Sequence, residues 1–170
     1  MVELNNIFGS LTHKAAESPD PSTQNAACIV GPDGRPCALS CNRPITTPYP
    51  SMPINAMKRE DKLARMSHAE EECVSYAMKH GIATRDCILC ALWAPCSGCA
   101  RDIIRAEVRS VVVYAKLLDQ TPHRWFSEVT RGVNLLLEAG IRFVRYEGPL
   151  AEPASFRFNG DWVKFREITG

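Results

Sequence analysis

The first part of the chain changes from a helical to an extended pattern of apolar residues. Between residues 2 and 17, apolar side chains recur every three or four positions, which predicts an amphipathic helix with one buried stripe. Two short apolar runs follow, Ala26–Val30 and Pro36–Cys41, and the turn sequence Gly31-Pro32-Asp33-Gly34 separates them. This arrangement predicts a β-hairpin.

From residue 83 onward, predicted strands and helices alternate. A helix from His68 to about His80 precedes this region and ends at Gly81. The later elements are the strands Cys87–Trp93, Ser110–Tyr114 and Ile141–Tyr146 and the helices Cys96–Ala106 and Pro122–Ala139. Together with the hairpin strands, they predict a three-layer α/β/α domain, with helices on both faces of a mixed five-stranded sheet.

Two stretches lie outside this regular pattern. The connection from Asn42 to Met66 contains several prolines and a charged run, and connections of this length in compact domains are usually functional or disordered. Residues 147–170 hold four aromatic side chains among polar ones: Phe156, Phe158, Trp162 and Phe165. We therefore expect one domain over residues 1–146 and a tail, 147–170, that packs on the body or on a neighbouring subunit.

The composition is that of an ordinary globular domain. The 170 residues are 45% hydrophobic and 23% charged, and the net charge is +1. This charge provides no basic field, so we expect no stable complex with nucleic acid. No apolar run reaches the length of a membrane span, so we expect no membrane association. The charged first 18 residues do not resemble an export signal, so we expect the eight cysteines to stay reduced in the cytoplasm.

Two short motifs, His68-Ala69-Glu70 and Pro95-Cys96-Ser97-Gly98-Cys99, carry the most informative chemistry. They provide one imidazole, two thiolates and a carboxylate that is not needed as a ligand. Three protein ligands leave one position of a tetrahedral zinc ion open to water, and zinc lowers the pKa of that water toward neutrality. Glu70 is then free to move protons. The combined H-x-E and P-C-x-x-C pattern is the signature of zinc-dependent base deaminases.

Each motif also has a second interpretation. Ser67 and Glu70 fit a helix capping box with Ser67 as the N-cap. Cys96 and Cys99 fit a redox pair at a helix N-terminus, where the helix dipole favours a thiolate. The two motifs together favour the zinc site, because capping requires no histidine at position 68.

The order of elements and motifs resembles the cytidine deaminase superfamily, and within it the deoxycytidylate (dCMP) deaminase branch. The stretch Asp20-Pro21-Ser22-Thr23-Gln24 is similar to a D-P-S-T-Q stretch of that branch, and Val111–Tyr114 is similar to its V-V-Y strand. The C-x-x-C-A helix that begins at Cys96 and the segment 136–141 extend the similarity over roughly residues 4–146.

The resemblance implies a zinc cofactor and a catalytic residue. By this resemblance His68, Cys96 and Cys99 are the zinc ligands, and Glu70 is the proton shuttle. It also implies a homo-oligomer, with sites completed by neighbouring subunits.

Substrate contacts are implied for residues next to these ligands. The backbone amides of Ala69 and Ser97 would help to bind the base, and Asn42 would reach the sugar hydroxyl. From the residues alone, Asn42 is equally suited to a turn. Arg43 offers a guanidinium that fits phosphate, and a solvated loop arginine is the alternative interpretation.

The sequence departs from the family at three positions near the expected substrate. Arg43 replaces the usual glycine, Glu72 replaces the usual asparagine, and Leu118 replaces a tyrosine that packs on the base in many members. A modified pyrimidine or another nucleotide therefore remains an alternative substrate.

Several other chemical groups have ordinary structural interpretations. Cys87 and Cys90 form a second C-x-x-C, but an odd offset on a strand places their sulfurs on opposite faces, so we expect core thiols. Trp93 fits a base pocket and a sheet core equally well. A run of basic residues is typical of a solvated helical face, with phosphate binding as the alternative: Lys58, Arg59, Lys62 and Arg65.

The sequence thus predicts hydrolytic deamination of a free pyrimidine deoxynucleotide, with dCMP converted to dUMP and ammonia. One alternative is deamination of a base in RNA or DNA, which would require a basic face and stacking aromatic side chains. A second alternative is a redox or structural zinc module without catalysis, in which Glu70 would be dispensable.

Overall fold

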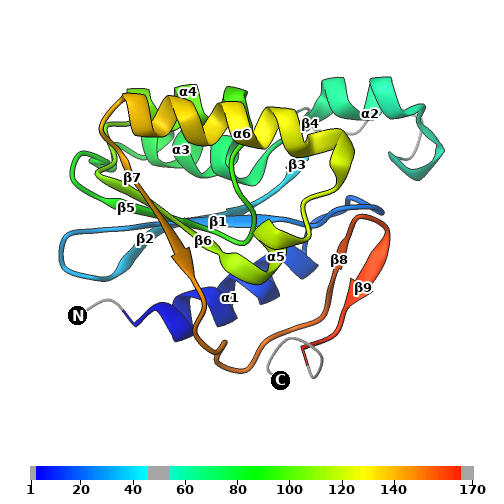
Figure 1. Cartoon of the computed structure of the whole chain (residues 1–170), viewed down its shortest axis with the longest axis horizontal. Helices are drawn as coiled ribbons and strands as arrows, with labels where there is room; N and C mark the ends of the chain where they lie inside the picture. The colour runs from blue at the N-terminus through cyan, green and yellow to red at the C-terminus, as the bar shows by residue number, and fades with distance from the viewer. Residues whose placement is uncertain (1–2, 46–53, 166–170) are drawn as a thin grey trace.

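A five-stranded sheet lies between two layers of helices in the computed structural model, which describes residues 3–45 and 54–165 (Figure 1). The strand order is β2-β1-β5-β6-β7. The strands are β1 (Ala26–Val30), β2 (Pro36–Cys41), β5 (Ile88–Ala91), β6 (Ser110–Tyr114) and β7 (Arg142–Tyr146). β1 is antiparallel to both of its neighbours, whereas β5, β6 and β7 are parallel, so the sheet is mixed. The predicted fold class is confirmed.

Helices cover both faces of the sheet. One face carries α3 (Ala69–Lys79), α4 (Ser97–Arg105) and α6 (His123–Glu138), and the other carries α1 (Leu4–Ala16) and the short α5 (Ala115–Asp119) (Figure 1). Because both faces are covered, β1 and β6 are buried along their whole length, which explains their continuous apolar runs.

The two faces form two separate hydrophobic clusters. Cys87 and Leu89 belong to the cluster under α3, α4 and α6, whereas Cys90 belongs to the cluster over α1. The sulfurs of Cys87 and Cys90 therefore lie on opposite faces of the sheet, as the odd offset predicts.

The connection between β2 and α3 contains ordered elements of its own. They are β3 (Arg43–Pro44), the 3-10 helix η1 (Ile54–Ala56), α2 (Arg59–Arg65) and β4 (Met66–Ser67). β3 pairs with β4, which leads directly into α3. The basic run lies at the N-cap of α2 and within it, and this helix has no fully buried residue. Among the prolines of this connection, those at positions 48, 50 and 53 lie outside the described residues.

The described part of the tail packs on the layer of α1. It forms a hairpin of β8 (Phe156–Phe158) and β9 (Asp161–Val163), and Phe156 and Phe158 are buried in the cluster that contains Phe8. Residues 166–170 lie outside the described part, and the division at residue 146 stays a prediction. Within residues 3–45 and 54–165, every helix is too short or too polar to cross a membrane.

Candidate metal centre and active site

The N-termini of two helices meet at the candidate metal centre. His68 follows β4 and immediately precedes α3, and Cys96 holds the same position before α4. Cys99 lies in the first turn of α4 and is buried. Because α3 packs against α4, the three ligands predicted from separate motifs come together.

The first turn of α3 is capped in a different register from the predicted one. The N-cap is His68, whose backbone N–H donates to Glu71 Oε2 at 3.3 Å. The alternative interpretation with Ser67 as N-cap and Glu70 as its partner is therefore wrong by one residue. Glu71 supplies the capping carboxylate, which leaves Glu70 available for another role.

The spacing of the three donor atoms fits a tetrahedral zinc ion. His68 Nδ1 lies 3.5 Å from Cys96 Sγ and 3.3 Å from Cys99 Sγ, and the two sulfurs are 3.7 Å apart. Zinc bonds of about 2.3 Å to sulfur and about 2.0 Å to nitrogen require separations of about 3.8 Å and about 3.5 Å at tetrahedral angles. Among the described residues, these three form the group of histidine, cysteine and carboxylate ligands that could hold a metal.

The three donors influence one another's protonation. The hydrogen bond with Cys99, reinforced by His68, lowers the pKa of Cys96 to about 4. The hydrogen bond to Cys96 raises the pKa of His68 to about 9, and the Cys96 thiolate raises the pKa of Cys99 well above its ordinary value. Cys96 is thus a thiolate, whereas His68 and Cys99 carry protons that a metal ion would displace on binding. In the core, by contrast, burial raises the pKa of Cys28 to about 12, so that thiol stays neutral.

Glu70 lies beside the donor atoms on the wall of a cavity. Glu70 is only 2% exposed, and its Oε2 lies 3.8 Å from Cys99 Sγ. Burial raises the pKa of Glu70 to about 7, and the nearby His68 opposes this effect. A carboxyl group with a pKa near neutrality can both accept and donate protons at physiological pH.

The cavity has a volume of about 570 Å³, which is within the range of small-molecule sites. His68, Glu70 and Cys96 form its metal side. The remaining wall comes from the loop that precedes β1, from α2 and from the start of α6. Side chains from these three regions include Asp20, Ser22, Thr23, Arg59, Lys62, Arg124 and Trp125.

Two of the four predicted substrate-contact residues line this cavity. Ala69 and Asn42 are both on the wall and buried. The Asn42 side chain already has backbone partners, since Oδ1 accepts from the Asn25 N–H at 2.7 Å and Nδ2 donates to the Thr23 carbonyl at 2.9 Å. These two hydrogen bonds hold the loop before β1 and place the Asn42 side chain on the cavity wall.

The other two predicted residues lie outside the wall of the cavity as the described residues define it. The Ser97 hydroxyl donates to Glu128 Oε2 at 2.7 Å, which ties α4 to α6. The Arg43 side chain is 48% exposed, and its Nε lies 3.9 Å from Glu72 Oε2. Two of the residues that depart from the family pattern, Arg43 and Glu72, thus face each other.

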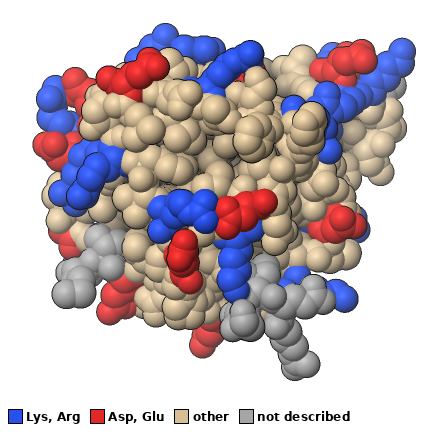
Figure 2. Space-filling model, viewed as in Figure 1, with Lys and Arg blue, Asp and Glu red and all other residues tan. Residues whose placement is uncertain are grey.

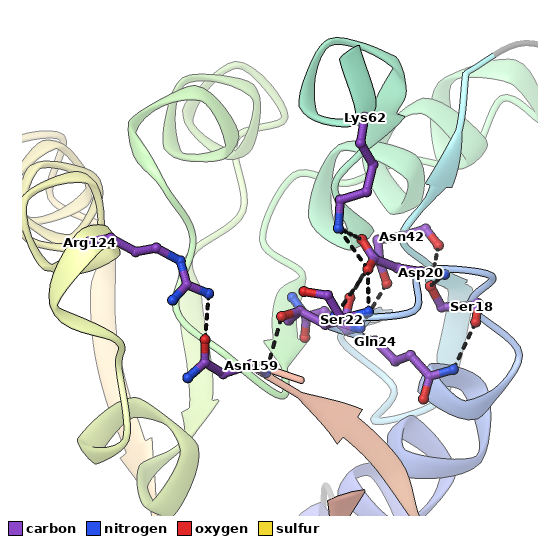
Figure 3. A network of polar contacts seen from close by, with 10 residues as sticks. Ser18, Asp20, Ser22, Gln24, Asn42, Lys62, Arg124 and Asn159 are labelled. Carbon is purple, nitrogen blue, oxygen red and sulfur yellow. Dashed lines mark hydrogen bonds and ion pairs between the residues drawn. The ribbon is translucent and has the colours of Figure 1, made fainter. Parts of the chain in front are cut away.

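Sequence reasoning missed a buried ion pair on the opposite wall. Lys62 Nζ lies 2.9 Å from Asp20 Oδ1 and 3.0 Å from Oδ2 (Figure 3). Asp20 Oδ1 also accepts from the backbone N–H groups of Ser22 and Thr23, at 2.8 and 3.1 Å. An aspartate followed by serine and threonine is a signal for such a turn, but the pairing with Lys62 has no local signal.

Two tryptophans also border the cavity. Trp93 contacts Trp125 edge-on at 6.1 Å between ring centroids, and Trp125 lies 6.3 Å from the ring of His68. Trp93 Nε1 donates to Thr121 Oγ1 at 2.9 Å, and the same ring packs edge-on against Phe158. Trp93 thus lines the cavity and also packs against the hydrophobic clusters.

The face seen in Figure 2 carries basic and acidic side chains interspersed, without a continuous basic surface. This distribution agrees with the net charge of +1.

Comparison with known proteins places this geometry in a family. Residues 5–115 match the family described as the cytidine and deoxycytidylate deaminase zinc-binding region. A search of curated protein sequences finds no match.

Among solved structures, the dCMP deaminase of cyanophage S-TIM5 in its apo form has a TM-score of 0.60 at 16% identity, over 85% of this chain and 95% of that one. The same enzyme in complex with dCMP and dUMP has a TM-score of 0.58 at 15% identity, over 82% and 92% of the two chains. A third structure is the diaminohydroxyphosphoribosylaminopyrimidine deaminase/5-amino-6-(5-phosphoribosylamino)uracil reductase of Thermotoga maritima. It has a TM-score of 0.50 at 21% identity, over 80% of this chain and 33% of that one.

The structural similarities confirm the fold, and the family match covers most of the chain, including His68, Cys96 and Cys99. The donor geometry independently fits zinc. The chain therefore belongs to the cytidine and deoxycytidylate deaminase family of C–N hydrolases and carries its zinc-binding region.

Proposed function

We propose that the protein is a zinc-dependent deaminase of a pyrimidine deoxynucleotide, converting dCMP and water into dUMP and ammonia. The observation that carries this proposal is the position of Glu70, a buried carboxyl group beside the three zinc donors and on the wall of a cavity of about 570 Å³. A structural zinc or redox module requires neither this carboxyl group nor the cavity.

The residues have separable roles in this reaction. Zinc bound by His68, Cys96 and Cys99 supplies a Lewis acid that makes water nucleophilic near neutral pH. Glu70 accepts one proton of the attacking water and delivers it to ring nitrogen 3. It then carries the second proton to the departing amino group. The oxygen of the water becomes the new oxygen on carbon 4. The bond between carbon 4 and the amino nitrogen breaks, and ammonia leaves. The uracil base and the ammonia are both uncharged.

Substrate binding is proposed for groups that surround this centre. The backbone amides of Ala69 and Ser97, in the first turns of α3 and α4, are proposed to hold the base and the reacting centre. Asn42 is proposed to meet the sugar from the cavity wall. The identification of dCMP is supported by the structural neighbour that was crystallised with dCMP and dUMP.

Assembly and compartment are further parts of the proposal. Side chains of Met78, Phe126 and Leu137 are exposed on α3 and α6, and β7 is an edge strand of the sheet. These features support a homo-oligomer. The eight cysteines are all free thiols, which supports a reducing cytoplasm as the site of action.

The proposal is tested by ammonia release from purified zinc-loaded protein over a panel of substrates. The panel contains cytidine and deoxycytidine, their mono- and triphosphates, 5-methylated dCMP, adenosine nucleotides and a cytosine-containing oligonucleotide. We expect dCMP to give the highest kcat/KM. A higher value for the oligonucleotide would replace the proposal with nucleic-acid editing, and release from none of these compounds would return the chain to a non-catalytic zinc module.

A further inference from the structure

Three basic side chains line the cavity, and they differ in what balances their charge. Lys62 forms a close ion pair with Asp20, so its charge is neutralised. Arg59 lies over the ring of Trp125 at 5.9 Å, and this contact with a neutral ring leaves its charge in place. Arg124 donates to the Asn159 side-chain oxygen, a neutral acceptor. In the described part of the chain, no carboxylate lies within ion-pair distance of Arg124. Its full charge thus remains available at the cavity.

Asn159 reaches Arg124 from the tip of the tail hairpin. It connects β8 to β9 and adopts a positive φ of 55°, a conformation that asparagine tolerates better than most residues. Its backbone N–H donates to Thr23 Oγ1 at 3.2 Å, and the next N–H, of Gly160, donates to the Ser22 carbonyl at 2.7 Å. The tip is therefore fixed to the loop before β1 on one side and to α6 on the other.

The hairpin also supports other parts of the cavity wall. The backbones of Gln24 and Arg157 are joined by a hydrogen bond of 2.8 Å, and the Gln24 side chain accepts from the Arg157 N–H at 2.7 Å. Phe158 packs edge-on against Trp93 at 5.2 Å between ring centroids. Figure 3 shows Arg124 extending from its helix toward Asn159, across from Lys62 and Asp20.

We propose that Arg124 binds the phosphate of the substrate and that Asn159, at the tip of the β8–β9 hairpin, is the residue that positions it. This inference rests on the proposed nucleotide deaminase function. The guanidinium of Arg124 has donors beyond the one used on Asn159, and its planar fork matches a phosphate. A neutral positioning partner holds the side chain without cancelling the charge that phosphate needs. Arg43, which the sequence favours for this role, lies off the cavity wall and faces Glu72.

The first test compares kcat/KM for dCMP and for deoxycytidine in the zinc-loaded protein. Arg124→Ala should lower the ratio of the two values about 10- to 100-fold, with zinc content unchanged. Arg59→Ala and Arg43→Ala are the matched controls, since each removes one arginine near the same cavity. Isothermal titration with the product dUMP should show the same loss of affinity in the Arg124 variant alone.

The second test separates positioning from simple structural support. Asn159→Gly removes the acceptor without backbone strain, and it should raise KM for dCMP about 3- to 10-fold with kcat unchanged. Asn159→Asp keeps an acceptor at the same place but neutralises Arg124. It should therefore lower the dCMP-to-deoxycytidine ratio at least as much as Asn159→Gly. If Asn159 only supports the structure, Asn159→Asp should have the wild-type ratio of kcat/KM for dCMP to kcat/KM for deoxycytidine.

Defined outcomes would overturn the inference and leave the proposed function intact. If Arg124→Ala lowers kcat/KM equally for nucleotide and nucleoside, Arg124 does not bind the phosphate. If the ratio collapses in Arg59→Ala or Arg43→Ala instead, one of those arginines does. A wild-type ratio in Asn159→Asp would make Asn159 a structural residue. If the wild-type protein deaminates no substrate of the panel, the proposed function itself fails.

Discussion

The metal centre differs from the rim of the cavity, by which we mean the residues Asp20, Thr23, Lys62, Arg124 and Asn159, in how its groups are spaced along the chain. At the metal centre, Cys96 and Cys99 are three residues apart, and His68 and Glu70 are two apart, on two neighbouring helix N-termini. The rim is instead tied together across the chain. The Asn159–Thr23 hydrogen bond joins residues 136 positions apart. The groups assigned to chemistry thus fall into two short motifs that the sequence reveals, whereas the groups assigned to substrate selection are single residues without a local motif.

The largest expected effect is the loss of metal when one ligand is removed. Cys99→Ala leaves two donors, and because metal binding is coupled to folding, we expect zinc content well below one per chain and a lower Tm. Zinc content by atomic absorption and Tm by calorimetry measure these effects. Cys90→Ala is the control, since it removes another fully buried thiol on the opposite side of the sheet. Its zinc content should stay at one per chain, and full occupancy in Cys99→Ala would remove Cys99 from the ligand set.

The next largest effect should come from the rim. Asp20→Ala removes the ion pair with Lys62 and the acceptor of two backbone N–H groups, in a side chain only 8% exposed. We expect a loss of about 2–4 kcal/mol in the free energy of unfolding, measured with urea. Lys62→Ala should cost less, because Asp20 keeps its two backbone donors. Zinc content should not change in either variant.

The matched control for this ion pair is the exposed pair Arg145–Asp119, in which the two residues are also far apart in sequence. Arg145→Ala should leave the unfolding midpoint nearly unchanged, since exposed pairs contribute little. An Asp20→Ala variant as stable as Arg145→Ala would show that the buried pair does not organise the rim.

A smaller effect is expected from alanine substitutions at two glycines, Gly132 near the metal centre and Gly9 far from it. A Cβ on Gly132 of α6 would overlap the Pro95 carbonyl beside Cys96, and a Cβ on Gly9 of α1 would overlap the Ala151 carbonyl in the tail. Each alanine variant should lose about 1–3 kcal/mol of stability through overpacking. Gly132→Ala should also weaken zinc binding in a chelator competition, whereas Gly9→Ala should not. Equal zinc affinity in the two variants would contradict the separation of the two regions.

How much the sequence could predict follows the same division. β1 and β6 have continuous apolar runs, the long helices have apolar residues at helical spacing, and the metal donors have fixed spacings, so these features are readable from one chain. The capping register was misassigned because Glu70 and Glu71 are adjacent, and either one satisfies an S/H-x-x-E spacing. Only the backbone geometry shows that His68 is the N-cap.

The rim could not be predicted because its partners have no local signature. Nothing near Lys62 in the sequence distinguishes it from Lys58 or Arg65, yet only the position of Lys62 brings it to Asp20. Arg124 and Asn159 likewise meet because the tail folds back across α1 and the loop before β1. Such pairings depend on how whole elements pack against each other, and local patterns in a single sequence do not reveal that packing.

The most direct test of the central claim is the turnover of Glu70→Gln beside Glu71→Gln. The first replaces the proposed proton shuttle by a side chain of the same shape, and the second changes its neighbour, which caps α3. Ammonia release from dCMP should fall about 10²–10⁴-fold in Glu70→Gln with one zinc per chain retained, and should stay close to wild type in Glu71→Gln. Near-wild-type turnover in Glu70→Gln would contradict the account.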